Sequence, residues 1–327
     1  MALTRMFGFD HLPDGLVVPK LIDAAQTPYL ELLRTMFTFS NMDVTTTIST
    51  VNVDGIPFKG LKIPATQGAS INTTPAGLNI GFRLSAEAFT GFSVFHIKEY
   101  YTGNVWDYTG ATSGLTELGI TAGKGSYYIE MYIGSVNGKG YSPFTIAVNG
   151  VQKVSAYCSK SSGLNWPNSG VVLSDLYYCV GGASPGITFP LGSVRVKTSK
   201  PSHVVNSSNL LTVNTSDPAD VELGKVWVGK TSKDGYCLID KPGVESTIEF
   251  PQLSENIIAA MVEVQTSRGS ASASTITLTP TDGTTEKTPL TYTPSSHAAL
   301  KPDIKNFMFD KPYLAAETGG FKVKVKC

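Results

Sequence analysis

The amino-acid sequence predicts an all-β protein, and three observations support this. Charged residues make up only 16% of the 327 residues, while glycine alone occurs 32 times. Short apolar runs alternate with stretches rich in Gly, Ser, Thr and Asn, which suits strands and turns better than helices. The length exceeds the roughly 100–200 residues of an ordinary domain, so two β domains are expected.

The first 45 residues lack this strand pattern, and we expect an arm and a short helix there. Thr27 and Pro28 suit the N-cap and first turn of a helix, which is predicted around residues 28–37. The segment before it is interrupted by prolines and glycines, so it is predicted to be an extended arm.

This arm is too apolar to remain solvated. Its apolar residues include Met6, Phe7, Phe9 and Leu12. They need a surface to cover, which is either this chain's own sandwich or a neighbouring subunit. We expect residues 1–45 to act as a docking arm in assembly, because extended segments suit addition to the edge of a neighbour's sheet.

Residues 46–203 are predicted to form the main sandwich domain. The clearest signal is the pair Asn149-Gly150, which suits a type I′ turn between strands at 144–148 and from 151 onward. Residues 127–133 alternate between two faces, which predicts a half-buried strand. Further strands are predicted at 48–53 before the Asp54-Gly55 turn, and at 78–84, 92–97, 171–180 and 194–198.

A polar stretch after the sandwich predicts a domain boundary. Lys200-Pro201-Ser202 and the run of Asn and Ser at 206–209 are typical of a linker. Residues 204–327 are therefore expected to form a smaller β domain. Its predicted strands are 226–228, 236–239, 257–265, 274–279 and 321–325.

Composition argues against two classes of partner. Basic and acidic residues balance at 26 each, and no basic stripe is interleaved with aromatic residues, so nucleic acid is not expected. The N-terminus lacks a basic segment followed by a long apolar core, and no stretch approaches the roughly 18 apolar residues of a spanning helix. We therefore expect the protein to be synthesised in the cytoplasm and not to insert into a membrane.

No metal site or cofactor is expected. The cysteines are widely separated, and no histidine is spaced to complete a zinc site. The nearest acidic cluster, at 217–220, suits a solvated turn better than the oxygen-rich loop that calcium requires. We expect the cysteines to be free thiols in the reducing cytoplasm, and disulfide formation after release from the cell is left open. The cysteines are Cys158, Cys179, Cys237 and Cys327.

No catalytic apparatus is recognisable in the sequence. Glycoside hydrolysis needs two carboxyl groups that flank one bond, whereas Glu130 stands alone in its predicted strand. We expect Glu130 to lie on a solvated strand face. A nucleophile elbow of the form G-x-S-x-G is also absent from the sequence, so we do not expect an enzyme.

Aromatic residues have a functional interpretation. Three tyrosines and a tryptophan gather in a loop rich in Gly and Thr, and another tryptophan lies between Asn165 and Pro167. Flat rings on a rigid sandwich stack well on sugar faces. The alternative is that they pack the long loops onto the sandwich or onto a neighbouring subunit. The candidate glycan-binding residues are Tyr100, Tyr101, Trp106, Tyr108 and Trp166.

Several short motifs resemble those of concanavalin A-like, laminin-G-type jelly-roll sandwiches. YYIEMYI at 127–133 and FTIAVNGV at 144–151 look like consecutive strands of that fold. DLYYC at 175–179 and LGSVRV at 191–196 resemble a stretch of tailed-phage virion proteins with this fold, which open with an arm similar to RMFGFD at 5–10. Two residues depart from the pattern: Asn149 replaces the usual Asp, and Cys179 stands where a β-branched residue is common.

The resemblance implies a concanavalin A-like jelly roll followed by a smaller β domain, in a non-enzymatic structural protein of a phage virion. Such a protein would belong to the head, collar, baseplate or a fibre, with other virion proteins and copies of itself as partners. Two alternatives stay open. One is a carbohydrate-binding adhesin that recognises a host surface polysaccharide, and the other is a polysaccharide-cleaving enzyme on the same fold.

Overall fold

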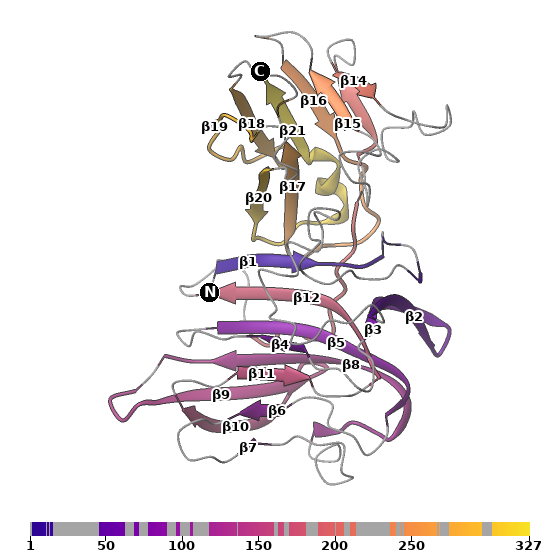
Figure 1. Cartoon of the computed structure of the whole chain (residues 1–327), viewed down its shortest axis with the longest axis vertical. Helices are drawn as coiled ribbons and strands as arrows, with labels where there is room; N and C mark the ends of the chain where they lie inside the picture. The colour runs from indigo at the N-terminus through magenta and orange to yellow at the C-terminus, as the bar shows by residue number, and fades with distance from the viewer. Residues whose placement is uncertain are drawn as a thin grey trace. The chain divides into compact units, whose positions relative to one another are not determined.

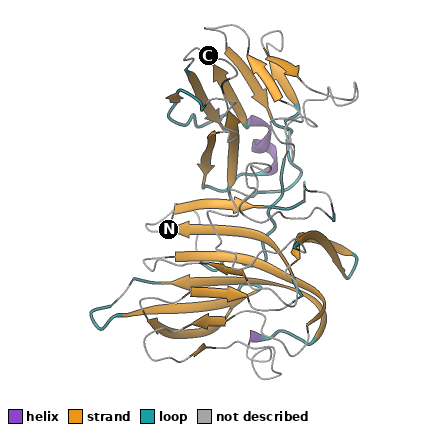
Figure 2. Cartoon of the chain, viewed as in Figure 1, coloured by secondary structure: helices purple, strands orange, loops and turns teal. Residues whose placement is uncertain are grey.

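The computed structural model shows a nearly all-β chain, as the sequence predicts, and its described residues form two compact units. Every strand pair among these residues is antiparallel (Figures 1 and 2). Among the described residues, those up to Thr198 belong to the first unit and those from Ser199 onward to the second. The described residues are 2–10, 12, 14–15, 46–62, 69–71, 78–89, 96–98, 105–106, 118–135, 137–159, 163–166, 170–180, 189–199, 201–205, 210–213, 236–239, 243, 245–266, 268, 275–295 and 303–327.

The main sheet of the first unit contains eight strands. Its order is β10-β9-β8-β5-β12-β3-β2, and β1 also pairs with β12. Figure 1 shows β12 running between β1 and β5. The bounds are β1 Ala2–Phe7, β2 Thr47–Val53, β3 Ile56–Lys62, β5 Leu78–Phe89, β8 Gly123–Ile133, β9 Tyr141–Val148, β10 Val151–Ser159 and β12 Val172–Val180.

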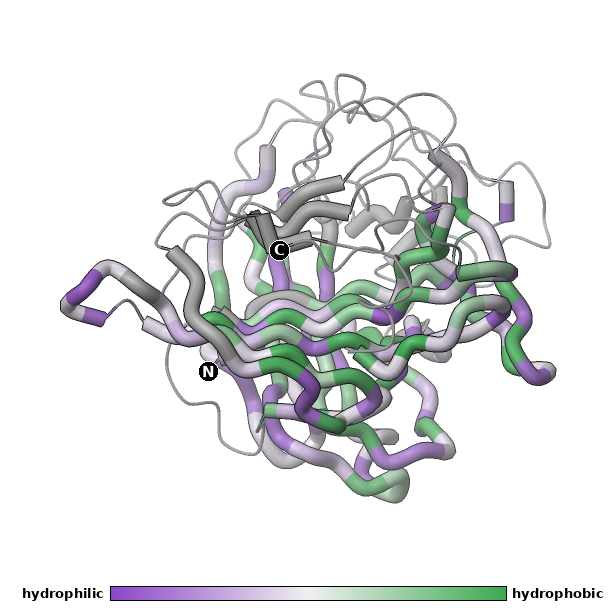
Figure 3. The backbone as a smooth tube through the Cα atoms, turned by 90° about the horizontal axis from the view of Figure 1, so that it is seen from below, coloured by the Kyte–Doolittle hydropathy of each residue, from purple (hydrophilic) through white to green (hydrophobic). Residues whose placement is uncertain are grey.

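A second sheet of the same unit has four short strands in the order β4-β11-β6-β7. Their bounds are β4 Ala69–Ile71, β6 His96–Lys98, β7 Val105–Trp106 and β11 Gly163–Trp166. Along the main sheet, hydrophobic and hydrophilic positions alternate, as the colours in Figure 3 show. This alternation is the period-two pattern from which the strands are predicted.

The two predicted tight turns are confirmed by backbone geometry. Asn149 and Gly150 have φ angles of 49° and 80°, and Asp54 and Gly55 have 51° and 79°. Positive φ at both central residues is the signature of a type I′ turn. Val148 pairs directly with Val151 across the first of these turns.

The central strand β8 is buried on both faces, so the prediction of a half-buried strand is wrong. Tyr128, Ile129 and Glu130 are all 0% exposed, although they alternate between the two faces. The irregular segment 189–199 lies against the polar face, where it contacts Glu130. The strand predicted at 194–198 is also wrong, because these residues are irregular and hydrogen-bond to side chains of the sheet.

The N-terminal segment is part of the first unit's own sheet. Ala2–Phe7 pairs with β12, and Phe7, Phe9 and Leu12 are buried within the chain. Met6 is half-buried. The prediction that these residues form an arm for docking on another subunit is therefore corrected, because their own sandwich already covers them. The helix predicted at 28–37 lies outside the described residues.

The second unit is a smaller two-layer β structure. One layer has the order β13-β16-β21-β18-β19, and the other is the pair β17-β20, with β14-β15 as a separate pair. The predicted strand at 226–228 lies outside the described residues, and the four other predicted strands are present. The bounds are β13 His203–Val205, β14 Leu210–Val213, β15 Tyr236–Ile239, β16 Glu245–Glu249, β17 Ala260–Thr266, β18 Ile276–Thr281, β19 Leu290–Tyr292, β20 Asp303–Phe309, the 3-10 helix η5 Ala315–Gly320 and β21 Lys322–Lys326.

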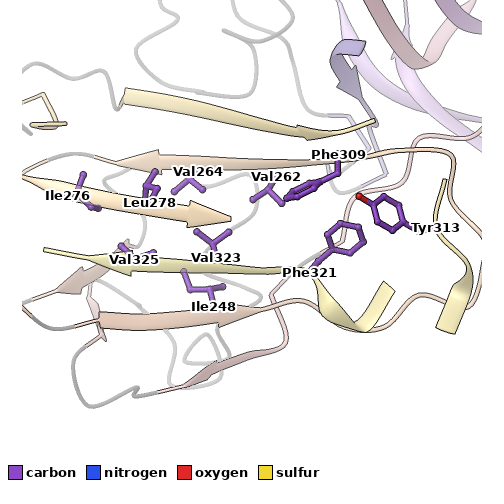
Figure 4. Close-up of a cluster of buried hydrophobic side chains, with 10 residues drawn as sticks. All are labelled: Ile248, Val262, Val264, Ile276, Leu278, Phe309, Tyr313, Phe321, Val323 and Val325. Atoms are coloured by element: carbon purple, nitrogen blue, oxygen red, sulfur yellow. The ribbon is translucent and has the colours of Figure 1, made fainter. Parts of the chain in front are cut away.

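The core of the second unit lies between these layers. Figure 4 shows Val262 and Val264 of β17 pointing toward Leu278 of β18 and Val323 of β21. Aromatic rings close one end of this cluster, where Tyr313 and Phe321 meet with ring centroids 5.1 Å apart. Buried residues alternate with mostly half-buried ones along β18 and β21, which produces this single apolar face.

Candidate functional site

The sequence-predicted glycan site is described only in part. Tyr100, Tyr101 and Tyr108 lie outside the described residues, whereas Trp106 ends β7 and Trp166 ends β11.

The strand register places both tryptophan positions on one face of the four-stranded sheet. Trp106 pairs with Ile97, and Ile97 pairs with Leu164, which is two residues from Trp166. Directly paired residues share a face, and so do residues two apart on a strand. The face that carries these positions also carries Ile71, the partner of Leu164. The prediction that these aromatic residues bind a glycan stays a prediction.

A different cluster gathers the charged residues of the main sheet. Glu130 accepts hydrogen bonds from the Tyr177 hydroxyl at 2.7 Å and from the backbone N–H groups of Leu191 and Gly192 at 2.7 and 2.9 Å. Burial raises the pKa of Glu130, and these three hydrogen bonds oppose the rise. The expectation of a solvated strand face is wrong for Glu130, because its carboxylate binds the segment that covers it.

Asp175 occupies an irregular point in β12, where the register with β5 shifts. Its backbone has a φ of 49°, which an Asp tolerates better than most residues. Its carboxylate receives Arg83 Nε at 2.7 Å, Arg195 Nε at 3.2 Å and the N–H of Val196 at 2.9 Å. Arg83 and Asp175 are almost fully buried, with side-chain exposures of 4% and 5%, so each charge depends on the other for compensation.

The two arginines extend the same cluster. Arg83 donates to the Ser193 hydroxyl at 3.0 Å and to the carbonyl of Val194 at 2.8 Å. The guanidinium carbons of Arg83 and Arg195 lie 4.9 and 4.7 Å from the centroid of the Phe58 ring. These are cation–π distances, so Phe58 of β3 helps to hold both arginines in place.

A third carboxylate comes from the N-terminal segment. Both oxygens of Asp10 accept the N–H of Thr198, at 3.1 and 3.0 Å. A Cβ placed on Gly8 would lie 2.4 Å from the carbonyl oxygen of Val196, so only glycine permits this approach. We call Asp10, Glu130 and Asp175 the carboxylate clamp, because each accepts backbone N–H groups of residues 191–198.

The carboxylate clamp stabilises the backbone of residues 191–198. Its carboxylates accept hydrogen bonds from backbone N–H groups of a segment that pairs with no strand, so these N–H groups do not stay unsatisfied.

Among the described residues, no group of three or more His, Cys, Asp or Glu side chains is arranged to hold a metal ion. In the same part of the chain, no helix is both long and apolar enough to cross a membrane. Cys179 is a buried thiol and Cys327 a half-buried one.

A smaller polar cluster, which was not predicted from the sequence, lies in the second unit. Asp282 is buried and accepts the Tyr313 hydroxyl at 2.6 Å and the Thr284 N–H at 3.0 Å, with Lys311 Nζ at 3.2 Å. Burial alone would raise the pKa of Asp282, but its hydrogen bonds hold that pKa well below the usual value. The local signal for this cluster is the Asp-Gly-Thr-Thr turn at 282–285.

Comparisons with known proteins show weak likenesses only. No family model matches the chain, and the search of curated proteins finds no match. Among solved structures, domain 4 of AbnA, a GH43 extracellular arabinanase from Geobacillus stearothermophilus in complex with arabinotriose, is 12% identical with a TM-score of 0.32. That alignment covers 54% of this chain and 91% of the other.

Two further solved structures cover more of this chain at lower TM-scores. The tandem CBM51 modules of a family 98 glycoside hydrolase from Streptococcus pneumoniae are 10% identical, with a TM-score of 0.23 and coverage of 98% and 97%. A triple jelly-roll protein of an archaeal virus turret is 11% identical, with a TM-score of 0.22 and coverage of 92% of this chain and 58% of the other. At these scores the function has to be argued from the residues themselves.

Proposed function

We propose that this chain is a non-enzymatic structural protein of a tailed-phage particle. The observation that supports the proposal is that the motifs resembling tailed-phage virion proteins contact one another in space, together with the concanavalin A-like motif at 127–133. They lie far apart in the sequence, yet their charged and glycine residues belong to the clamp and to the segment that it holds.

Three sets of contacts join these motifs to the motif at 191–196. Gly8, from the motif at 5–10, lies against the carbonyl of Val196 in the motif at 191–196, and Asp10 of the same motif binds Thr198, two residues further on. Glu130, from the motif at 127–133, binds Leu191 and Gly192. Asp175, from the motif at 175–179, binds Arg195. Residues that bind one another have a physical reason to occur together in one protein. This supports the view that the motifs are parts of one structural arrangement rather than separate chance matches.

The same contacts support a scaffold rather than an enzyme. A general acid and a nucleophile must both reach the bond that they break. Glu130 is 0% exposed and Asp175 is 4% exposed, and both bind partners within the chain. We therefore assign these carboxylates to the architecture of the particle protein.

The proposal is tested on particles released by the cell that carries this gene. Particles purified on a density gradient should contain the chain in a fixed ratio to the major structural proteins, measured by quantitative mass spectrometry. Its absence from particles that are complete and infectious would contradict the proposal. Reducing-sugar assays with host polysaccharide test the enzyme alternative directly.

Carbohydrate binding is the alternative that the aromatic residues suggest. The register places the positions of Trp106 and Trp166 on the same face of the four-stranded sheet, and packing of these rings is the competing interpretation. A glycan array decides between the two: binding that is lost in Trp106→Ala, with unfolding behaviour unchanged, would replace the packing interpretation.

A further inference from the structure

Three Asp-Gly pairs lie at turns of the described chain, namely Asp14-Gly15, Asp54-Gly55 and Asp282-Gly283. Each glycine has a positive φ, of 79°, 79° and 87° in that order. Glycine leaves the approach to its own nitrogen open, because it has no side chain. The three pairs therefore share one local chemistry and differ in what surrounds them.

Asp-Gly pairs can rearrange without an enzyme. The glycine nitrogen attacks Cγ of the aspartate and closes a succinimide ring, while one carboxyl oxygen leaves as water with the amide proton and a proton from solvent. Water then opens the ring: at one carbonyl it restores aspartate, and at the other it gives isoaspartate, in which the main chain runs through Cγ. The reaction requires that the aspartate carboxyl group and the glycine N–H are free to meet.

Asp14-Gly15 is held at both reacting groups. The Thr50 hydroxyl donates to the Asp14 carboxylate, whose oxygens lie 2.9 and 3.0 Å away. The Gly15 N–H donates to the carbonyl of Ile48 at 2.8 Å. Both partners belong to β2, so two contacts with this strand must break before the Gly15 nitrogen can reach Cγ of Asp14.

Asp282-Gly283 is held in the same way in the second unit. The buried Asp282 carboxylate accepts the Tyr313 hydroxyl at 2.6 Å, and the Gly283 N–H donates to the Thr281 hydroxyl oxygen at 3.0 Å. Gly283 is also crowded, since a Cβ placed on it would lie 2.9 Å from Cα of Gly320. Burial and hydrogen bonding together keep the two reacting groups of this pair apart.

Asp54-Gly55 forms the exposed tip of the β2–β3 hairpin. Within the described part of the chain, neither the Asp54 carboxylate nor the Gly55 N–H has a hydrogen-bond partner. We propose that Asp54 is a site of spontaneous isoaspartate formation, and that the contacts at Asp14 and Asp282 protect those two positions.

Isoaspartate at position 54 adds one atom to the main chain inside a two-residue turn, next to the pair of Val53 with Ile56. Ile56 is 51% exposed, so the change lies at the solvated end of the hairpin and not in the core. An exposed tip is also open to other proteins. An isoaspartyl methyltransferase is therefore the class of enzyme expected to act on the modified chain.

Ageing of the full chain in neutral buffer tests this proposal. Samples are digested, and isoaspartate is located by electron-transfer fragmentation and by labelling with an isoaspartyl methyltransferase. Isoaspartate should accumulate at Asp54 at least about tenfold faster than at Asp14 or Asp282, which corresponds to about 1.4 kcal/mol. In urea the three rates should converge, because the local chemistry is the same once the contacts are lost.

Thr50→Val tests the cause of protection at Asp14. It removes the hydroxyl donor and keeps a β-branched side chain in β2. The rate at Asp14 should rise several-fold, while the rate at Asp54 stays at the parent value. If this variant does not fold, the comparison of the folded parent with the parent in urea still measures the protection.

Asp54→Asn extends the comparison to deamidation, because Asn149-Gly150 forms a turn with nearly the same φ angles. The Asn149 side-chain oxygen accepts the N–H of Tyr128 at 2.9 Å. In Asp54→Asn, position 54 should lose ammonia at least about tenfold faster than Asn149, again about 1.4 kcal/mol. Peptide masses measure both rates in one digest.

Three results would overturn the proposal. Isoaspartate could form at Asp14 or Asp282 as fast as at Asp54 in the folded chain. The ratio of the three rates could be the same in urea, which would assign the difference to local sequence. In Asp54→Asn, positions 54 and 149 could lose ammonia equally fast. No readout uses particles, so failure of this proposal and failure of the proposed function remain distinguishable.

Discussion

Tyr177 reaches Glu130 across an intervening strand. Gly81 of β5 pairs with Glu130 on one side and with Tyr177 on the other, and the Tyr177 hydroxyl donates to the Glu130 carboxylate at 2.7 Å. A Cβ on Gly81 would lie 2.0 Å from Cε1 of Tyr177. The hydrogen bond from Tyr177 to Glu130, the residue that binds segment 189–199, therefore depends on a glycine in the strand between them.

Gly81→Ala should destabilise the first unit by about 3 kcal/mol or more, because a buried ring and the adjacent Tyr128 hydroxyl must shift to admit the new methyl group. Urea denaturation followed by tryptophan fluorescence measures the loss. Gly138→Ala is the matched control, since a Cβ there meets no atom within 4 Å. Equal unfolding midpoints for the two variants would contradict the packing described here.

Tyr177→Phe should lower the free energy of unfolding by about 1.5–3 kcal/mol, because it removes one donor to a buried carboxylate and leaves the ring in place. Tyr127→Phe removes a hydroxyl whose partner, the Thr121 N–H, is exposed and can bind water instead. We expect a change of about 0.5 kcal/mol or less for that control. Equal decreases in the free energy of unfolding in both variants would show that the hydrogen bond to Glu130 stabilises the fold no more than an exposed one.

The pH dependence of unfolding tests the environment of Glu130. Burial raises its folded-state pKa, so the folded chain binds the Glu130 proton more tightly than the unfolded chain does. The contribution of this group to stability is then greatest below the unfolded pKa of about 4.3 and is lost as pH rises through the folded pKa. Measured by urea denaturation, the parent should gain stability relative to Glu130→Gln between pH 7 and pH 4. If the parent instead loses stability relative to Glu130→Gln toward pH 4, the folded-state pKa of Glu130 is lowered.

In the second unit, the contribution of Asp282 to stability should have the opposite pH dependence to that of Glu130. Its hydrogen bonds hold the folded pKa below the usual value, so its contribution is present above the unfolded pKa of about 3.9 and is lost as pH falls toward the folded one. Asp282→Asn should therefore unfold more easily than the parent at pH 7, with the gap narrowing toward pH 3. Calorimetry that resolves the second unit's transition checks this, and a constant gap would argue against it.

Phe9→Ala should destabilise the first unit by about 3–5 kcal/mol, as expected for a large ring removed from a packed core. Leu314→Ala is the control, because Leu314 is 61% exposed and its truncation should change stability by about 0.5 kcal/mol or less. A Phe9→Ala variant that unfolds like the parent but fails to self-associate would restore the docking-arm hypothesis.

The parts of this fold that local sequence determines could be predicted, and the clamp could not. Asn149-Gly150 identifies its hairpin because the turn geometry is a property of two adjacent residues. Segment 189–199 carries no such signal. Its backbone is held by Glu130, 61 residues from Leu191, and by Asp10, 188 residues from Thr198. The alternation at 194–198 suggested a strand, but these residues pair with side chains rather than with another strand.

The pairing of the first strand with β12 also dictates an order of events during synthesis. Ala2–Phe7 leaves the ribosome well before its partner residues 176–180, which follow about 170 positions later. Loop-closure entropy makes such distant pairings slow to form. The nascent chain must therefore carry an apolar, unpaired segment until most of the first unit has been translated, and during that interval it is exposed to chaperones and to neighbouring chains.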